Sequence, residues 1–307
     1  MSTEEKRDLT AGMREFDFGV IREPFDTLRM AMGNKIEREW PGKSNHTADG
    51  GQALILGLYK ASENYLSAAR FLIADQSPVH TRKPEFALAL PPLTRAILDA
   101  LGTTVYLFGS FEKRVTLHYK AGWREIVEET TRLKAAYADD PEWKTNLATR
   151  DEMIVNRAGV FGITEAEQKD LKLIKRFPIP DHMYPAGSTS SRAKYIRYLI
   201  DWFYRTLSQD AHLSFSGIAR SLPLLTRTDV SQETKSLHLE LRRANGAIVM
   251  FTLMLALITE LELELRFGLA ERAKYVWSVL NDWSPEPREV YDRFYSGILG
   301  PASAKPI

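Results

Sequence analysis

An arginine and a histidine two helical turns apart are the strongest candidates for chemistry in this sequence. Arg205 and His212 are separated by six residues, with Ser208 between them. Because residues seven apart return to nearly the same angular position on a helix, both side chains are predicted to share one face if the helix reaches His212. Histidine exchanges protons near neutral pH, and arginine binds phosphate through two parallel hydrogen bonds. The pair therefore suits metal-independent phosphodiester cleavage, with His212 as general acid and base and Arg205 stabilising the transition state.

A purely structural role for the same residues stays open. Asp201 and Arg205 are four residues apart, which is the spacing of a favourable surface ion pair on a helix. His212 would lie near the carboxyl end of that helix, where a cation is stabilised by the helix dipole.

The helix that must carry this pair is predicted from Ser191 to Ala211. An upstream helix, from Pro91 to Phe108, places Arg95 and Asp99 four residues apart on one face. If the two polar faces meet, their side chains form a cluster that must be hydrogen-bonded internally to be tolerated. Such a cluster is either a site or a structural clamp between two helices.

The segment Tyr204–Ser214, YRTLSQDAHLS, resembles the Y-x-x-L-S-x-x-x-H-x-S signature of a bacterial all-α family of unknown function. That family is itself similar to HEPN domains. The helix around Arg95 and Asp99 also resembles the family's R-x-x-x-E helix, and the resemblance covers roughly residues 90–260. Residues 1–50 have no counterpart in it.

Many HEPN domains are metal-independent ribonucleases that use an R-x(4–6)-H motif and often act as dimers. The resemblance therefore implies a ribonuclease or RNA-binding protein of a bacterial toxin or antiviral system, forming a homodimer and using neither metal nor cofactor. Tyr204 and Ser208 would orient the two catalytic groups. The sequence departs from the family pattern at two positions: Thr206 follows the arginine, where the family prefers a particular polar residue, and Asp99 replaces a glutamate.

A basic stretch precedes the motif. Residues 169–198 contain seven lysines and arginines against two acids, with tyrosines interleaved. Arg192, Lys194, Arg197 and Tyr198 are predicted to guide RNA through phosphate contacts and stacking. A solvated helix face is the structural alternative.

Periodicity over the rest of the chain predicts an all-α fold, a helical bundle with an HEPN-like core and additional N-terminal helices. We divide it into an N-terminal arm and helix (1–50), a helical core (51–270) and a C-terminal helical extension (271–307). A long helix is predicted from Ser231 to Phe267, with a possible break near Gly246. Its uncharged run, residues 244–259, is too short to span a bilayer and predicts a buried core helix.

Composition limits the classes of function that remain. The formal charge of +1 gives no global attraction to nucleic acid or membrane, and the absence of cysteine excludes thiolate chemistry and disulfides. The charged N-terminus lacks a secretory pattern, which favours the cytoplasm. Two alternatives to the ribonuclease stay open: a non-catalytic helical scaffold that binds a protein partner, and a membrane-attached helical protein.

Overall fold

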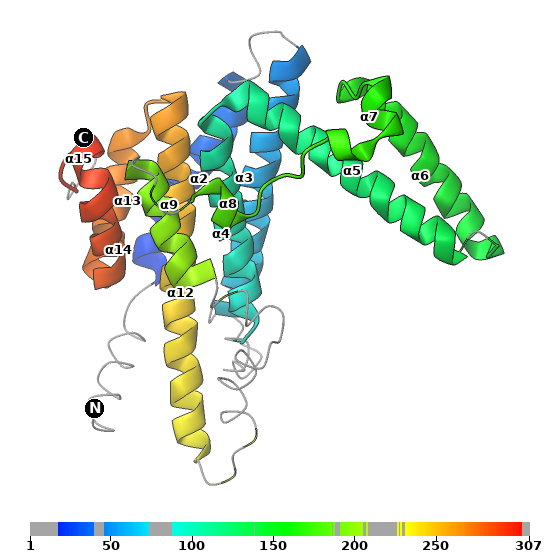
Figure 1. Cartoon of the computed structure of the whole chain (residues 1–307). Coiled ribbons are helices and arrows are strands. Elements are labelled where there is room, and N and C mark those ends of the chain that lie inside the picture. The colour runs from blue at the N-terminus through cyan, green and yellow to red at the C-terminus, as the bar shows by residue number, and fades with distance from the viewer. Residues whose placement is uncertain are drawn as a thin grey trace. The chain divides into compact units, whose positions relative to one another are not determined.

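The computed structural model describes residues 18–39, 46–73, 88–137, 139–185, 187, 191–204, 207, 226, 228 and 231–302. These residues form helices and connections without a β-strand, which confirms the predicted all-α class (Figure 1). The longer helices are α2 (Phe18–Glu39), α3 (His46–Ile73), α4 (Leu90–Phe108), α5 (Phe111–Tyr137), α6 (Pro141–Val160), α9 (Ser191–Leu199), α12 (Gln232–Leu265) and α13 (Ala270–Trp283). An HEPN-like arrangement of these helices stays a prediction.

Short helical pieces complete the description. They are α7 (Glu165–Lys169), α8 (Pro180–Met183), α14 (Pro285–Val290), α15 (Ser296–Leu299), a 3-10 turn at Leu171–Leu173, and π-helical turns at Ile200–Tyr204 and Tyr291–Tyr295. The chain divides into two compact units. The first unit comprises the described parts of 1–43, 55–105 and 184–307, and the second those of 44–54 and 106–183. The predicted division at residues 50 and 270 is not tested by these units.

Helix α12 forms the centre of the first unit, where it contacts α2, α13 and α14 (Figure 1). Every residue from Met250 to Glu262 is buried. It is the one described helix long and apolar enough to cross a bilayer, and 83% of its most apolar window is buried. That burial agrees with the predicted core helix, since core helices of soluble proteins meet the same criteria of length and composition.

Polar contacts join α2 to α3 within the first unit. Arg70 donates two hydrogen bonds to the Asp26 carboxylate, at 2.6 and 2.9 Å. Arg29 donates to Glu63 at 2.7 Å, and the buried Tyr59 hydroxyl donates to the Arg29 carbonyl at 2.7 Å. Fork-shaped guanidinium–carboxylate pairs of this kind fix the register of two helices as well as holding them together.

The second unit is built on a pair of helices, α5 and α6, with α7 and the turn at Leu171–Leu173 packed against them. Trp123 is buried at its centre beside Ala158, Ile163 and Ile174, and its indole N–H donates to the Ile154 carbonyl at 2.9 Å. The sequence Thr164-Glu165-Ala166-Glu167 predicts a capping box that starts a short helix running to Arg176. Thr164 and Glu167 form this box, but α7 ends earlier, at Lys169.

Three predictions for the N-terminal helices are wrong in detail. The sequence predicts a helix from about Phe25 to Trp40, a loop through Asp49-Gly50-Gly51, and then a helix with an apolar stripe at Leu54, Leu58, Ala61, Tyr65, Ala68 and Leu72. Helix α2 instead begins at Phe18, and α3 begins at His46, so the Asp49-Gly50-Gly51 sequence is helical. The buried face of α3 lies one residue later than the predicted stripe, because Leu54 to Tyr59 is apolar over a wide arc and spacing alone cannot choose the face. The buried residues on this face are Ile55, Tyr59, Ser62, Leu66 and Ala69, and Glu63 is buried as well.

The structure decides between the two alternatives that the sequence leaves open for the helix from Ser231 to Phe267. Helix α12 is continuous through Gly246, where the missing side chain allows close packing: a Cβ there would lie 3.1 Å from the Leu90 Cδ1 atom. Helix α13 lies in the segment predicted as a C-terminal helical extension, and it buries Trp277 completely.

Candidate functional site

Three of the predicted site residues lie together in the first unit: Arg95 and Asp99 on α4, and Tyr204 at the end of the π-helical turn Ile200–Tyr204. We call them the Arg95 cluster. The Arg95 Nη2 donates a hydrogen bond to the Tyr204 hydroxyl at 3.0 Å, and the guanidinium carbon lies 4.9 Å from the centre of the tyrosine ring. The same cation therefore makes both a hydrogen bond and a cation–π contact with one side chain.

Asp99 completes the cluster on the same face of α4. Its carboxylate lies 3.7 Å from the Arg95 Nε. Burial raises the pKa of Asp99, and the neighbouring Arg95 charge opposes this by lowering it. The aspartate side chain is 44% exposed and the arginine 20%, so the cluster is open to solvent on the Asp99 side.

The remaining catalytic candidates, Arg205, Ser208 and His212, lie outside the described residues. Their mutual geometry therefore stays a prediction. The structure does describe the residue immediately before them, because Tyr204 directly precedes Arg205 in the sequence. Helical spacing predicts that Ile196, Leu199, Ile200, Phe203, Leu207 and Ala211 face the core. Ile196, Leu199 and Ile200 are buried, Phe203 and Leu207 are half-buried, and Ala211 lies outside the described residues.

The π-helical turn before Arg205 is a local irregularity of the kind often found at functional sites. It ends the nine-residue helix α9 and carries the chain from the buried Ile200 to the half-buried Tyr204. A second π-helical turn at Tyr291–Tyr295 packs in the core of the same unit. The turn alone is thus not specific evidence for a site.

The predicted RNA-guiding residues on α9 are largely engaged by protein groups. Arg192 forms ion pairs with Glu260, at 2.7 Å, and with Glu264. Burial lowers the pKa of Arg192, but the two carboxylates outweigh it, and the net pKa is raised. Arg197 donates to Asp201 at 3.0 Å and to the Tyr184 carbonyl at 3.4 Å.

The other two residues of that set differ from each other. Lys194 is exposed. The Tyr198 ring is half-buried, with the Arg293 guanidinium carbon 5.2 Å from its centre, and burial raises the pKa of its hydroxyl. An RNA contact by the four residues stays a prediction, and Lys194 is the cation among them that is most available to solvent.

Three glutamates, Glu260, Glu262 and Glu264, follow the apolar run of α12, and the sequence favours a solvated helix end for them. Glu264 is exposed as predicted, but the prediction is wrong for the other two. Glu260 is 3% exposed and Glu262 is 4% exposed. The Tyr295 hydroxyl donates to Glu260 Oε1 at 3.2 Å, and Arg192 faces the other oxygen as an ion pair. Burial raises the pKa of Glu260 to about 6. The sequence did carry a signal for the burial of Glu260, because this residue directly follows an apolar run and continues its helical spacing of core-facing residues.

Comparisons with models of protein families, with curated proteins and with solved structures give no match. The HEPN-like resemblance therefore depends on the motif residues alone. Among the residues that the structure describes, no group of three or more histidine, aspartate or glutamate side chains is placed to hold a metal ion.

Proposed function

We propose that this chain is a metal-independent, HEPN-like ribonuclease or RNA-binding protein. The observation that supports the proposal is the contact between Arg95 and Tyr204, which holds the residue directly before Arg205 against α4. Arg205, Ser208 and His212 are predicted to share one face of the helix that follows. Positioning matters because a displacement of about 1 Å can cost on the order of a hundredfold in rate.

The proposed reaction is attack of a ribose 2′-hydroxyl on the adjacent phosphorus. His212 takes the 2′-hydroxyl proton as general base, and a proton is returned to the departing 5′-oxygen, either by His212 or by its counterpart in a second copy of the chain. The products are a 2′,3′-cyclic phosphate and a free 5′-hydroxyl. Arg205 stabilises the pentacoordinate phosphorane through its two parallel N–H donors.

Tyr204 and Ser208 are assigned positioning roles in this scheme. Tyr204 is held by Arg95, and Ser208 lies one turn from Arg205 on the predicted helix. A homodimer that brings two motifs together, a cytoplasmic location, and a place in a bacterial toxin or antiviral system all follow from the resemblance and are part of the proposal.

The experiment is incubation of varied RNAs with the full chain in the presence of EDTA. The wild type should cleave, and His212→Ala should lose cleavage by at least about a hundredfold, the usual contribution of a general acid–base. His238→Ala is the matched control, because His238 is an exposed histidine on α12 and should not affect the rate. Equal cleavage by wild type and His212→Ala would reject the catalytic assignment.

A non-catalytic helical scaffold that binds a protein partner is the second candidate. The pairing of Arg192 and Arg197 with carboxylates supports it, because guanidinium groups compensated within the protein attract phosphates less strongly. Retained fold with no cleavage and no RNA binding by the wild type, at low salt and across varied RNAs, is the result that favours the scaffold.

A further inference from the structure

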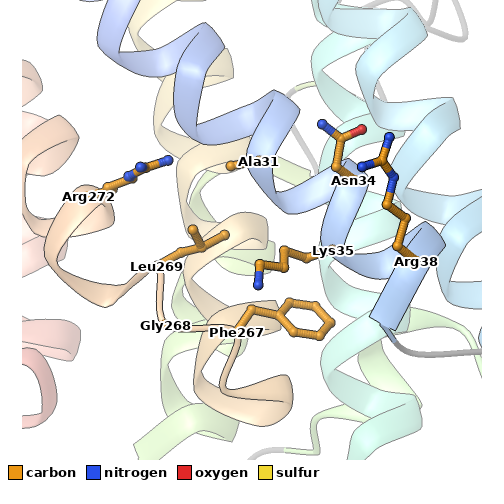
Figure 2. A pocket seen from close by; sticks show the side chains of 8 residues that line it. All are labelled: Ala31, Asn34, Lys35, Arg38, Phe267, Gly268, Leu269 and Arg272. Atoms are coloured by element: carbon orange, nitrogen blue, oxygen red, sulfur yellow. The ribbon is translucent and has the colours of Figure 1, made fainter. Parts of the chain in front are cut away.

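A cavity of about 380 Å³ opens in the first unit between α2 and the connection from α12 to α13. Figure 2 shows the side chains that line it. They are Ala31, Asn34, Lys35, Arg38, Phe267, Gly268, Leu269 and Arg272. The volume lies within the range of small-molecule sites, which is roughly 300–1,000 Å³.

Cations approach this cavity from two elements. On α2, Asn34 and Arg38 lie one turn apart, and Lys35 extends over Phe267 (Figure 2). Arg272 points from α13 toward α2. No carboxylate of a described residue lines the cavity. Within the described part of the chain, neither Arg38 nor Arg272 forms an ion pair with an acid.

The position of Arg272 is unfavourable for the protein alone. Arg272 lies in the first turn of α13, where the helix dipole disfavours a cation. Glu271, the acid of the same turn, pairs instead with Lys274 at 2.8 Å. Departures from such local rules are expected where a function compensates for them.

The connection between α12 and α13, which lines the cavity, is held by hydrogen bonds to a buried carboxylate. The buried Glu262 carboxylate accepts the backbone N–H groups of Phe267 at 3.2 Å and Gly268 at 3.0 Å. Arg266 and Gly268 both adopt the left-handed backbone region, with φ of 55° and 77°. The Glu262 carboxylate is thereby hydrogen-bonded to the connection, and it forms no ion pair with Arg38 or Arg272 among the described contacts.

We propose that this cavity binds a small molecule bearing a phosphate group. Arg38 and Arg272 present planar donors that match phosphate oxygens, and Asn34 adds an amide. The Phe267 ring and the apolar Ala31 and Leu269 offer a surface for an organic portion of the ligand. The site uses none of the residues assigned to RNA cleavage.

The test is isothermal titration of the full chain at low ionic strength with three probes: inorganic phosphate, AMP and adenosine. AMP should bind more tightly than adenosine. If inorganic phosphate binds as well as AMP, the site recognises the free ion, and if only AMP binds, it recognises an organic phosphate; both results support the proposal. Absence of binding by both phosphate and AMP, or equal binding of AMP and adenosine, would overturn it.

Substitutions of the arginines that line the cavity test whether the ligand binds there. Arg38→Gln and Arg272→Gln should each weaken binding by about 10- to 100-fold, the loss expected for one charge-assisted phosphate contact. Arg132→Gln is the control, because Arg132 is an exposed helical arginine in the second unit. His212→Ala should bind as the wild type does, which separates this site from the proposed ribonuclease. Wild-type affinity in both cavity variants would contradict the proposal.

Discussion

The Arg95 guanidinium donates a hydrogen bond to the Tyr204 hydroxyl and lies 4.9 Å from the centre of the same ring. The two residues are 109 positions apart in the sequence. Their contact joins α4 to the turn that leads into the candidate catalytic segment, and the functional proposal starts from it.

Removing this contact should cost stability in a coupled manner. Tyr204→Phe deletes the hydroxyl and keeps the ring, and Arg95→Gln deletes the cation. Because the pair is partly buried, a double-mutant cycle by denaturant unfolding should give a coupling free energy of about 1 kcal/mol. Strictly additive effects of the two substitutions would show that the contact does not contribute to the folded state.

The buried Glu260 should make stability depend on pH. Burial raises its pKa from 4.5 to about 6, so between these values the folded state holds a proton that the unfolded chain has lost. This group therefore favours folding below about pH 4.5, and the benefit disappears as pH rises through 6, a change of about 2 kcal/mol.

The measurement is the difference in unfolding free energy between wild type and Glu260→Gln from pH 4 to pH 7, which cancels contributions common to both. Because Arg192 lowers the pKa of Glu260, Arg192→Gln should enlarge the pH dependence. A difference that stays flat over this range, or one that changes in the opposite direction, would be inconsistent with the assignment.

The indole N–H of Trp277 donates a hydrogen bond to Thr259 Oγ1 at 3.0 Å in the core, and this contact should stabilise the folded state. Thr259→Val keeps the shape and leaves the donor unsatisfied, so the unfolding free energy should fall by about 1–3 kcal/mol. Thr116→Val is matched to it, because both hydroxyls donate to the carbonyl four residues earlier, but Thr116 is exposed. Similar losses in both variants would argue against a specific role for the indole contact.

Two glycines of α3 should respond in opposite directions to alanine. A Cβ at Gly51 would lie 2.7 Å from the Phe111 ring, whereas a Cβ at Gly57 meets no atom within 4 Å. Gly51→Ala should destabilise by about 1–3 kcal/mol through overpacking. Gly57→Ala should stabilise by up to about 1 kcal/mol through helix propensity. Thermal unfolding of the two variants checks this, and a stabilised Gly51→Ala would refute the close contact.

Sequence periodicity was sufficient where one face of a helix is clearly more apolar than the other. It predicted the stripe of Leu93, Ile97, Leu101 and Val105 on α4, of which Leu93 is half-buried and the others are buried, and it predicted the buried run of α12. It failed on α3, because apolar residues occupy several adjacent directions there. It left a break at Gly246 open, since a glycine that permits close packing looks like one that ends a helix.

The candidate site was predictable only in part, for a physical reason. The i,i+4 spacing of Arg95 and Asp99 is local information, and it correctly indicates a shared face. The partner of that face is decided by tertiary packing over more than a hundred residues. Glu260 was misplaced for the same reason, because only the fold brings Arg192 and Tyr295 to its carboxylate.

The most direct test of the central claim is analysis of the RNA ends formed by the purified chain in EDTA. The account predicts 2′,3′-cyclic phosphate and 5′-hydroxyl ends from the wild type, their loss in both Arg205→Ala and His212→Ala, and no cleavage where the scissile ribose is 2′-deoxy. Cleavage of the 2′-deoxy substrate, or the same ends produced by His212→Ala at the wild-type rate, would contradict it.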